Sequence, residues 1–452
     1  MTNDSQREYW NMDIEPMLNT PQIKEVQFSK LKTLLKKLYE AKPFWRNRMD
    51  EAGIDPDKLE SLEEFSQKMP IMDKAQRRQL VEDSGGDVWQ LIDLTTAVPN
   101  DEIVLMAATS GTSGEPTPYP HTQNDIDSKQ EVFARLAWRA GIRPGDRIVH
   151  AFGLSMWLAG VPYVQYLQKM GACILPVGAE GGAERILRFT KQFRATTLFG
   201  TPSLMEHLID RAPDIIGGPI SELGIKTILC AGEPGAGIPE VRQKIEQAYG
   251  AKLYDHGGAH GVSCDYAEYQ GMHHVADDHI LFELVDPDTL EPVPMENGAR
   301  GMPVQTTLDG EGMLWVRESF GDIFEVYTDQ CPCGASGFRY KVVGRVDDML
   351  KVKGVMVYPA AIDGVITGFS PRVTGEFRIV LTEEPPRVVP PIKLKVEYGE
   401  ELKQEDLPAL EKEIEEKMGA RLKIKPKITW VPPQSLPRSA GKTSFFEREY
   451  EE

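Results

Sequence analysis

Cysteine is scarce in this chain, with five cysteines among 452 residues. A small, odd number in a long chain argues against a disulfide framework and predicts a reducing, cytoplasmic compartment. The first residues are polar and acidic and lack the basic and apolar regions of a secretory signal peptide. No apolar run reaches the roughly 18 residues that a membrane-spanning helix needs. The sequence therefore predicts neither a secreted protein nor a membrane protein.

Positive charge is also in deficit. Lysine and arginine number 51 against 69 aspartates and glutamates, which gives a formal net charge of −18. A field of this sign repels polyanions, so neither nucleic acid nor an anionic membrane is expected as a partner. A small anionic ligand is still compatible, because a local loop can overcome a weak global field. The length exceeds that of one compact core and predicts two or more domains.

Hydrophobic periodicity predicts the first half of the fold. Residues 20–50 carry apolar side chains at three- and four-residue spacing, which predicts a helix. Over residues 101–265, the apolar runs DRIVHAFGL, GACILPV, TTLFG and IKTILCAG alternate with helical patterns such as ERILRFTKQF and PEVRQKIEQAYG. This alternation predicts an α/β fold in which helices cover parallel strands on both faces.

The pattern changes after residue 279. HILFELVDP, GMLWVRES and DIFEVYT are strand-like segments between proline and glycine turns, and they predict an antiparallel subdomain. Further on, IKLKVEYGE, LPALEKEIEEKMGA and LKIKPKITWV read strand–helix–strand, which is typical of a small α+β unit. We therefore expect a large N-terminal domain over residues 1–345 and a small C-terminal domain over residues 346–452, with the boundary near Arg345–Asp348.

A loop rich in hydroxyls and glycines follows the apolar stretch EIVLMAA. Its sequence is TSGTSGEPT, and its candidate phosphate-binding residues are Thr109, Ser110, Gly111, Thr112, Ser113 and Gly114. The glycines permit close backbone approach, and the hydroxyls and backbone N–H groups can converge on an anion. The loop lacks the lysine of a Walker motif. Its composition alone is also typical of a flexible surface linker.

Further motifs follow this loop in order: FGTPSLM (199–205), CAGEP (230–234), GMPVQTTLDGEGMLWVRESFGD (301–322), GRVDDMLKVKGVMVYPAAID (344–363) and LPRSAGKTSFF (436–446). Together with the loop they resemble the motifs of the adenylate-forming acyl-CoA synthetase superfamily and, within it, of the phenylacetate–CoA ligase-like family. The resemblance spans about residue 100 to the end of the chain. Any one of these motifs is weak, whereas the ordered set favours the family.

The resemblance implies an enzyme that joins a carboxylic acid to coenzyme A. The acid attacks the α-phosphorus of ATP to give an acyl-adenylate and pyrophosphate, and the thiol then displaces AMP. The implied catalytic residues are Lys442, which bridges the two anions, Arg345, which contacts phosphate, and Asp347, the hinge of a mobile C-terminal lid domain. Mg²⁺ is implied as the ion that neutralises the remaining phosphate charge.

The resemblance also implies nucleotide contacts outside the loop. The family's aspartate that binds the ribose hydroxyls corresponds to Asp322. The segments that border the adenine and precede the metal-binding position supply Gly232, Glu233, Pro234, Tyr254 and Asp255.

Two residues depart from the family pattern. The lysine expected in the phosphate loop is replaced by Glu115. The family's Tyr-Asp-x-Tyr-Gly-x-Ser/Thr-Glu segment, whose glutamate holds Mg²⁺, reads YDHGGAHG here, and Gly261 replaces the glutamate. One cation and one carboxylate are therefore missing. Either Glu115 takes over Mg²⁺ coordination, or it points to solvent and backbone donors suffice.

Three cysteines and a histidine are candidate metal ligands. Cys264 precedes His273 in CDYAEYQGMHH, and Cys331 and Cys333 lie in CPCG. Three thiolates and one imidazole complete a tetrahedral Zn²⁺ site, which the resembled family often carries at matching motifs. With no open position the metal is expected to be structural. His274 or His279 can substitute for His273, and free cysteines in turns are the alternative; Cys173 and Cys230 are expected to be buried packing residues.

The sequence indicates less about the acyl pocket than about the nucleotide and metal sites. FGLSMWLAGVPYVQY (152–166) is rich in apolar bulk, and Trp157 and Tyr163 are candidate pocket residues, although core packing explains such residues equally well. His256, Gly257 and His260 lie in a glycine-rich loop and suit hydrogen bonds to a polar acyl group. The acid is therefore expected to be either aromatic or short and hydroxylated.

Three functions remain open at this level. The first is the acid–CoA ligase, with the acid and coenzyme A as partners and a homodimer as the usual family assembly. The second is an adenylating enzyme that passes the acyl group to another acceptor. The third is a pseudoenzyme that binds nucleotide or acyl-CoA. The missing lysine and glutamate favour this third function, whereas the presence of Arg345, Asp347 and Lys442 argues against it.

Overall fold

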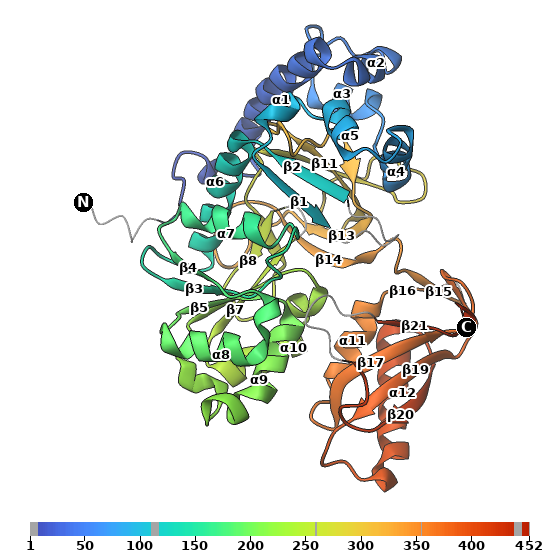
Figure 1. Cartoon of the computed structure of the whole chain (residues 1–452). Coiled ribbons are helices and arrows are strands. Elements are labelled where there is room, and N and C mark those ends of the chain that lie inside the picture. Colours follow the sequence, from blue (N-terminus) through green and yellow to red (C-terminus); the bar gives the residue numbers. More distant parts are fainter. Residues whose placement is uncertain (1–7, 110–116, 258–259, 354, 438–444, 452) are drawn as a thin grey trace.

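Helices α1 (Pro21–Ala41) and α2 (Pro43–Glu51) open the computed structural model, which describes residues 8–109, 117–257, 260–353, 355–437 and 445–451 (Figure 1). The single helix predicted over residues 20–50 is wrong, because proline cannot continue a helix and Lys42 before it is extended, with φ −128° and ψ 114°. Three short helices follow: α3 (Leu62–Lys68), α4 (Lys74–Asp83) and α5 (Val88–Thr95).

A two-stranded ribbon leads into the main sheet. Its strands are β1 (Leu105–Thr109) and β2 (Thr117–His121), and they pair antiparallel. The parallel part of the main sheet then has the order β4 (Cys173–Pro176), β3 (Arg147–His150), β5 (Thr197–Gly200), β6 (Thr227–Cys230) and β7 (Lys252–Gly257). Each predicted apolar run in this region contains one of these strands.

Helices cover both faces of these parallel strands. On β3, Ile148 packs in one core and Val149 in another, because successive side chains of a strand point to opposite faces. The first core includes helices α6 (Gln123–Arg139) and α7 (Val161–Gln168). The second includes α8 (Gly182–Gln192), α9 (Pro202–Ile216) and α10 (Pro239–Tyr249). The predicted α/β architecture is confirmed.

The edge of the parallel sheet corrects one prediction. Cys230 is buried in β6 as expected, but Cys173 is exposed. Cys173 begins β4, which is the last strand of the sheet and has a neighbour on one side only. Strand order is a tertiary property, so an apolar run of this kind does not reveal that it lies at an edge.

An antiparallel half extends the sheet beyond β7. Its strands follow in the order β8 (Gly261–Ser263), β9 (Met272–His274), β14 (Arg339–Arg345), β13 (Asp322–Tyr327), β11 (Arg300–Thr307) and β10 (Ile280–Val285). The short strand β12 (Glu318–Ser319) pairs with β11. Most of the predicted strand GMLWVRES is a loop, because the Asp125 carboxylate accepts hydrogen bonds from the backbone N–H groups of residues 311, 312 and 313.

The residues after β14 form a part with its own core, here called the C-terminal unit (residues 350–451). One sheet has the order β20 (Pro426–Val431), β19 (Ile392–Tyr398), β17 (Val373–Leu381) and β21 (Phe446–Arg448). A smaller one has the order β16 (Val355–Val357), β15 (Leu350–Val352) and β18 (Arg387–Val388). Helices α11 (Pro359–Thr367) and α12 (Leu407–Leu422) contribute to the core of the same unit.

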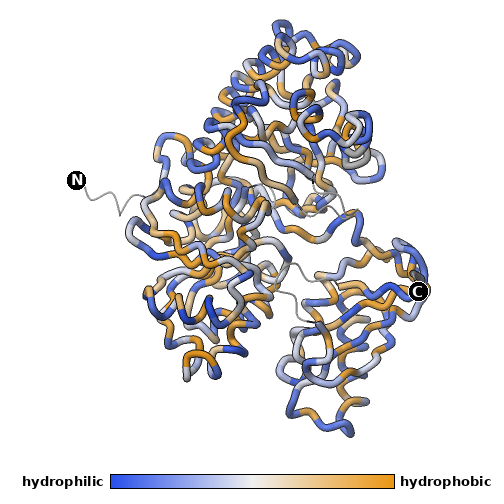
Figure 2. The backbone as a smooth tube through the Cα atoms, in the orientation of Figure 1, coloured by the Kyte–Doolittle hydropathy of each residue, from blue (hydrophilic) through white to orange (hydrophobic). Residues whose placement is uncertain are grey.

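The C-terminal unit lies beside α10 of the preceding part (Figure 1). Arg421 and Glu240 form an ion pair of 3.2 Å across this boundary. Hydrophobic residues follow the central strands in Figure 2, whereas hydrophilic residues dominate the outer loops and helices. Among the described helices, none is both long and apolar enough to cross a bilayer.

Candidate functional site

The carboxyl ends of β5, β6 and β7 meet at one edge of the sheet, as parallel strands require. The predicted motif FGTPSLM begins with the last two residues of β5, and CAGEP begins with the last residue of β6. The Glu233 side chain joins the two motifs, because its Oε1 accepts a hydrogen bond of 2.7 Å from the Ser203 backbone. Gly232 has φ +92°, a conformation that other residues rarely adopt. These segments form a ligand-accessible edge of the kind at which α/β proteins bind nucleotides.

Asp322 and Arg345 face each other at the ends of two neighbouring strands. They are cross-strand partners of β13 and β14, and Arg345 Nη1 donates to Asp322 Oδ1 over 2.6 Å. Arg345 also lies 3.5 Å from Asp347 Oδ2. Burial opposes the charge of the guanidinium, but Asp322, Asp347 and neighbouring Asp348 together raise its pKa. The arrangement holds a fixed positive charge directly beside the predicted ribose-binding carboxylate.

Tyr254 and Asp255, the predicted nucleotide contacts on β7, are both buried. Tyr254 belongs to the core beneath α6, and Asp255 accepts a 2.7 Å hydrogen bond from the hydroxyl of Tyr269. Burial raises the pKa of the Asp255 carboxyl to about 7, although the Tyr269 hydrogen bond acts in the opposite direction. Asp255 therefore connects β7 to the segment around Tyr269 in this structure.

An aromatic cluster surrounds the predicted acyl-pocket residue Tyr163. Its ring centroid lies 4.5 Å from that of Phe133 and 5.8 Å from that of Phe199. His256 packs against the same cluster, 6.0 Å from Tyr163. The Nδ1–H of His256 donates to the Gly261 carbonyl over 2.8 Å, so Nε2 is an acceptor; it is buried and has no partner among the described residues. The cluster combines apolar bulk with one polar atom.

Trp157 lies next to the strand that precedes the phosphate loop. It forms a parallel bridge with Ala108 of β1, and the neighbouring Leu158 N–H donates to the Ala108 carbonyl over 3.1 Å. The predicted acyl segment and the strand ending at Thr109 are therefore joined by backbone contacts. Gly257 ends β7 next to the aromatic cluster, and its carbonyl accepts from the Tyr340 hydroxyl over 2.5 Å.

His260 has a buried lysine as its partner. Lys129 Nζ lies 3.0 Å from His260 Nε2 and 5.4 Å from the centroid of the Trp315 ring. Sequence reasoning missed Lys129, Phe133 and Phe199. For Lys129 a signal exists, because it lies on the same helical stripe as the buried Ile126 and Phe133, where an apolar side chain is expected.

Several predicted residues lie outside the described ranges. These are Glu115, Lys442 and the loop residues Ser110, Gly111, Thr112, Ser113 and Gly114. The connection that contains Lys442 has two described ends. Before it, the Pro437 carbonyl accepts from Arg378 over 2.7 Å, and after it β21 pairs with β17 through Phe446. Both ends are thus fixed to β17.

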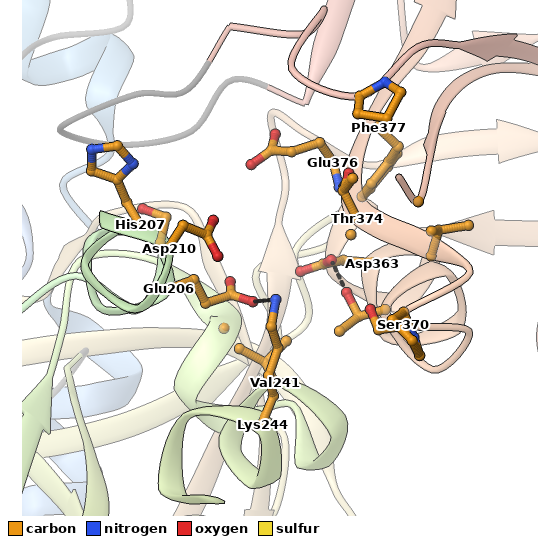
Figure 3. A pocket seen from close by; sticks show the side chains of 18 of the residues that line it. Glu206, His207, Asp210, Val241, Lys244, Asp363, Ser370, Thr374, Glu376 and Phe377 are labelled. Atoms are coloured by element: carbon orange, nitrogen blue, oxygen red, sulfur yellow. Dashed lines mark hydrogen bonds and ion pairs between the residues drawn. The ribbon is translucent and has the colours of Figure 1, made fainter. Parts of the chain in front are cut away.

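A cleft of about 790 Å³ separates the C-terminal unit from α9 and α10 (Figure 3). Its lining is strongly acidic: the carboxylates include Glu206, Asp210, Glu233, Asp363 and Glu376. The Lys244 ammonium, one of the few cations of the lining, forms an ion pair of 2.7 Å with Glu206. A triphosphate would be repelled here, so the phosphate-binding positions are expected at Arg345 and the hydroxyl-rich loop.

Asp363 on α11 faces these carboxylates in Figure 3. Burial, followed by the charge of Glu206, raises the pKa of the Asp363 carboxyl to about 8 from 3.8. Because the folded pKa is raised, the neutral acid stabilises this arrangement, and that contribution is lost between about pH 4 and pH 8. We expect Asp363→Asn, which stays neutral, to melt roughly 2–4 °C above the wild type at pH 8 and level with it near pH 4.

Differential scanning fluorimetry from pH 4 to pH 9 measures this difference. Glu416→Gln on the exposed face of α12 is the matched control, and its midpoint should follow the wild type throughout. A constant offset for Asp363→Asn at every pH contradicts the prediction.

The predicted metal ligands are gathered at one point. Cys264, His273, Cys331 and Cys333 offer donor atoms that all lie within 4.8 Å of one another. Tetrahedral Zn–S bonds of about 2.3 Å place two sulfurs about 3.8 Å apart, and Cys264 Sγ and Cys331 Sγ are separated by 3.8 Å. The residues present therefore fit a zinc ion. His274 and His279 bond instead to Asp277 and Asp309.

Outer contacts orient His273 toward the sulfurs. Its Nδ1–H donates to the Ser336 carbonyl over 3.1 Å, which leaves the Nε2 lone pair directed at Cys333 Sγ, 3.4 Å away. The Ser336 carbonyl also accepts a hydrogen bond from the Arg139 guanidinium of α6, and the Ser336 hydroxyl donates to the Glu15 carbonyl. The cluster thereby connects the N-terminal segment, α6 and the sheet.

The position of the family's Mg²⁺-binding glutamate does not fit that ion. A Cβ atom at Gly261 would lie 2.3 Å from the hydroxyl oxygen of Tyr340 and 2.7 Å from its Cζ. Tyr340 is fully buried in a stacked pair with Phe324, so it has no room to move aside. A carboxylate side chain is therefore excluded at residue 261 by packing.

Family models match both parts of the chain. The model described as AMP-binding enzyme covers residues 32–319, and that described as AMP-binding enzyme C-terminal domain covers residues 354–447. The chain belongs to the AMP-binding enzyme family. This AMP-binding enzyme is 31% identical to the phenylacetate-coenzyme A ligase of Thermus thermophilus, over 95% of the chain and 98% of the relative. The resemblance stated from the motifs is confirmed.

Two crystal structures of 2-hydroxyisobutyryl-CoA ligase allow a matched comparison. Both are 29% identical to this AMP-binding enzyme. The complex with 2-HIB-AMP in the postadenylation state gives a TM-score of 0.89, covering 99% of this chain and 93% of the other. The complex with 2-HIB-AMP and CoA in the thioesterification state gives 0.68, with coverage of 98% and 93%. The overall arrangement of this chain is therefore more similar to the postadenylation structure than to the thioesterification structure.

Proposed function

We propose that the protein is an AMP-forming acid–CoA ligase that activates an aromatic or a short hydroxylated carboxylic acid. The acid and ATP form an acyl-adenylate and pyrophosphate, and the thiol of coenzyme A displaces AMP to give the thioester. The observation that carries the proposal is the Asp322–Arg345 pair, set at the end of two strands in a chain of this family. It provides one carboxylate for the ribose hydroxyls and one permanent cation for phosphate.

The first half-reaction brings two anions together, so positive charge must lie where they meet. The Arg345 guanidinium is permanently charged, and the nearby carboxylates of Asp322, Asp347 and Asp348 raise its pKa further. We assign to Lys442 the bridging charge between the acid and the α-phosphate. The loop from Thr109 to Gly114 supplies backbone and hydroxyl donors to the β- and γ-phosphates.

The acid lies in the aromatic cluster around Tyr163. Phe133, Phe199 and His256 exclude water from its side chain, and Trp157 lies beside the strand that leads to the phosphate loop. His256 Nε2, which has no partner within the described part of the chain, accepts a hydrogen bond, and this suits an acid with a hydroxyl group. An aromatic acid without a hydroxyl leaves this atom unpaired.

The domains and their motion belong to the proposal. Residues 1–345 form the body and residues 346–452 the lid, which turns about Asp347 so that the two half-reactions use different faces. The high TM-score to a postadenylation structure supports a lid position reached after the acyl-adenylate has formed. A cytoplasmic location and a homodimer are part of the proposal, and they rest on composition and on the family resemblance.

Zinc has a structural role in this proposal. Cys264, His273, Cys331 and Cys333 would hold the ion, which joins the segment after β8 to the turn before β14. All four ligands come from the protein, so the ion supplies stability and no catalytic position.

A panel of acids tests the function. Purified protein is mixed with ATP, Mg²⁺ and either phenylacetate, benzoate, a hydroxybenzoate or 2-hydroxyisobutyrate, with and without coenzyme A. We expect pyrophosphate release with at least one acid and a thioester once coenzyme A is added. Release without any thioester would indicate another acceptor, and nucleotide binding without release would indicate a pseudoenzyme.

A single substitution tests the ribose contact. We expect Asp322→Asn to weaken AMP binding about 10-fold, because a hydrogen bond to a charged group contributes about 1.5–3 kcal/mol. The same variant should bind 3′-deoxy-AMP and AMP almost equally, whereas the wild type should prefer AMP. Calorimetric titration measures both ligands, and exposed Asp288→Asn is the control. An unchanged preference for AMP in Asp322→Asn assigns the ribose contact elsewhere.

A further inference from the structure

A lysine ammonium is buried next to the place where the family binds Mg²⁺. Lys129 is 7% exposed, and its Nζ contacts His260, the residue directly before Gly261. Full burial of a lysine is rare unless a carboxylate pairs with it. In the described ranges, no carboxylate lies within ion-pair distance of Nζ, although Asp125 and Asp309 are close enough to act on its charge.

Those two carboxylates are already engaged. Asp125 accepts from three backbone N–H groups of the loop after β11. Asp309 accepts from Ser128 and from His279. The ammonium is therefore held by a neutral imidazole on one side and the face of the Trp315 ring, 5.4 Å away, on another. Its charge is left uncompensated by any direct anionic contact within the described residues.

The tautomer of His260 follows from this contact. The ammonium can only donate, so Nε2 accepts and the ring proton resides on Nδ1. That Nδ1 atom is buried and has no hydrogen-bond partner among the described residues. His260 also has φ +62°, an uncommon conformation for a histidine. Among the described residues, a buried cation thus lies beside a buried N–H donor that has no partner, and an anion would satisfy both.

Position 261 has no space for a carboxylate, and a nearby ammonium further disfavours a divalent cation by repulsion. We propose that the Lys129 ammonium, positioned by His260, supplies the positive charge beside the nucleotide phosphates that the family pattern assigns to glutamate-bound Mg²⁺. The inference rests on the proposed function for the identity of the nucleotide. In this proposal, one residue on α6 provides the positive charge that the family obtains from the loop lysine and from the metal bound to the glutamate.

Binding measurements test this role without turnover. ATP, AMP and adenosine are titrated into the wild type, Lys129→Met and Lys129→Arg, all in EDTA. Methionine is similar in length and apolar, so the buried site tolerates it. We expect Lys129→Met to bind ATP about 10-fold more weakly and adenosine within 2-fold of the wild type. Lys129→Arg should recover most of the ATP affinity.

The pH dependence gives a second measurement. Burial lowers the pKa of the Lys129 ammonium to about 8, with Asp309 and Asp125 acting against this shift. Among the described residues, the other titratable groups around it are His121, His260 and His279. ATP affinity of the wild type should therefore fall between pH 7.5 and pH 9, and the fall should be absent from Lys129→Met and Lys129→Arg. His260→Asn, which tolerates the positive φ, should shift the midpoint of this fall.

Three results overturn the inference. One is an ATP affinity that Lys129→Met leaves unchanged. Another is an equal loss of ATP and adenosine affinity, which indicates a packing effect. The third is ATP binding by the wild type that disappears in EDTA, which favours metal coordination by Glu115. If ATP binding depends on Lys129 but the wild type forms no thioester with any acid, the proposed function is wrong and this inference still holds.

Discussion

Replacing Lys442 by methionine is expected to slow acyl-adenylate formation about 1000-fold, because this step loses the cation between two meeting anions. Thioester formation from added acyl-adenylate should change less than about 3-fold, because Lys442 is assigned to the step before the lid turns. Rapid-quench measurement of each half-reaction separates the two effects. The split is the signature of a residue that acts only before the lid turns.

The anchors on either side of Lys442 support this expectation. Arg378 holds the Pro437 carbonyl, and Phe446 pairs with Ile379, so both ends of the connection are fixed to β17. Residues of β17 also line the cleft that faces α9 and α10. Rotation of the C-terminal unit must therefore carry this connection with it.

Lys417→Met is the matched control, because Lys417 is exposed on α12 of the same unit. Its two half-reactions should match the wild type. Equal slowing of both half-reactions in Lys442→Met contradicts the assignment, since it indicates a general disturbance of the lid. Full activity would place the bridging cation on another residue.

Local sequence patterns predicted most of the fold. Strands β3, β5 and β6 are buried on both faces, so they are continuous apolar runs that are easily recognised. The break between α1 and α2 was also predictable, because Pro43 cannot continue a helix. The apolar spacing continues on both sides of it, which favoured a single helix. The loop after β11 had no local signal, because Asp125 of a distant helix binds its backbone.

In the candidate site too, some features were predictable from local sequence and others depend on contacts between distant residues. The four side chains of the candidate metal site could be selected from residue type, because few other chemistries use three cysteines and a histidine, and the structure brings them together. Lys129 was missed because its partner His260 is 131 positions further along the chain. The exclusion of a glutamate at Gly261 depends on the Tyr340 ring, and packing between such distant residues is invisible to motif comparison.

The metal cluster gives the second large expected effect. We expect the protein purified from zinc-containing medium to carry about one zinc per chain, and Cys331→Ser to carry less than about a tenth of that, because Cys331 is a buried ligand. The variant should melt roughly 10 °C lower, since loss of a structural metal costs several kcal/mol. Elemental analysis and scanning fluorimetry measure the two quantities.

The hydrogen bonds around Ser336 predict where the metal-free protein opens. Without zinc, His273 is no longer oriented, and the Ser336 contacts to Tyr9, Glu15 and Arg139 weaken with it. Limited proteolysis should therefore cut Cys331→Ser in the N-terminal segment and between β8 and β9 before the rest of the chain. Cys173→Ser changes an exposed cysteine outside the cluster and should keep its zinc, its melting temperature and its resistance to cleavage. A zinc-free wild type with the same melting temperature would show that the four side chains need no metal, since their mutual hydrogen bonds would then suffice.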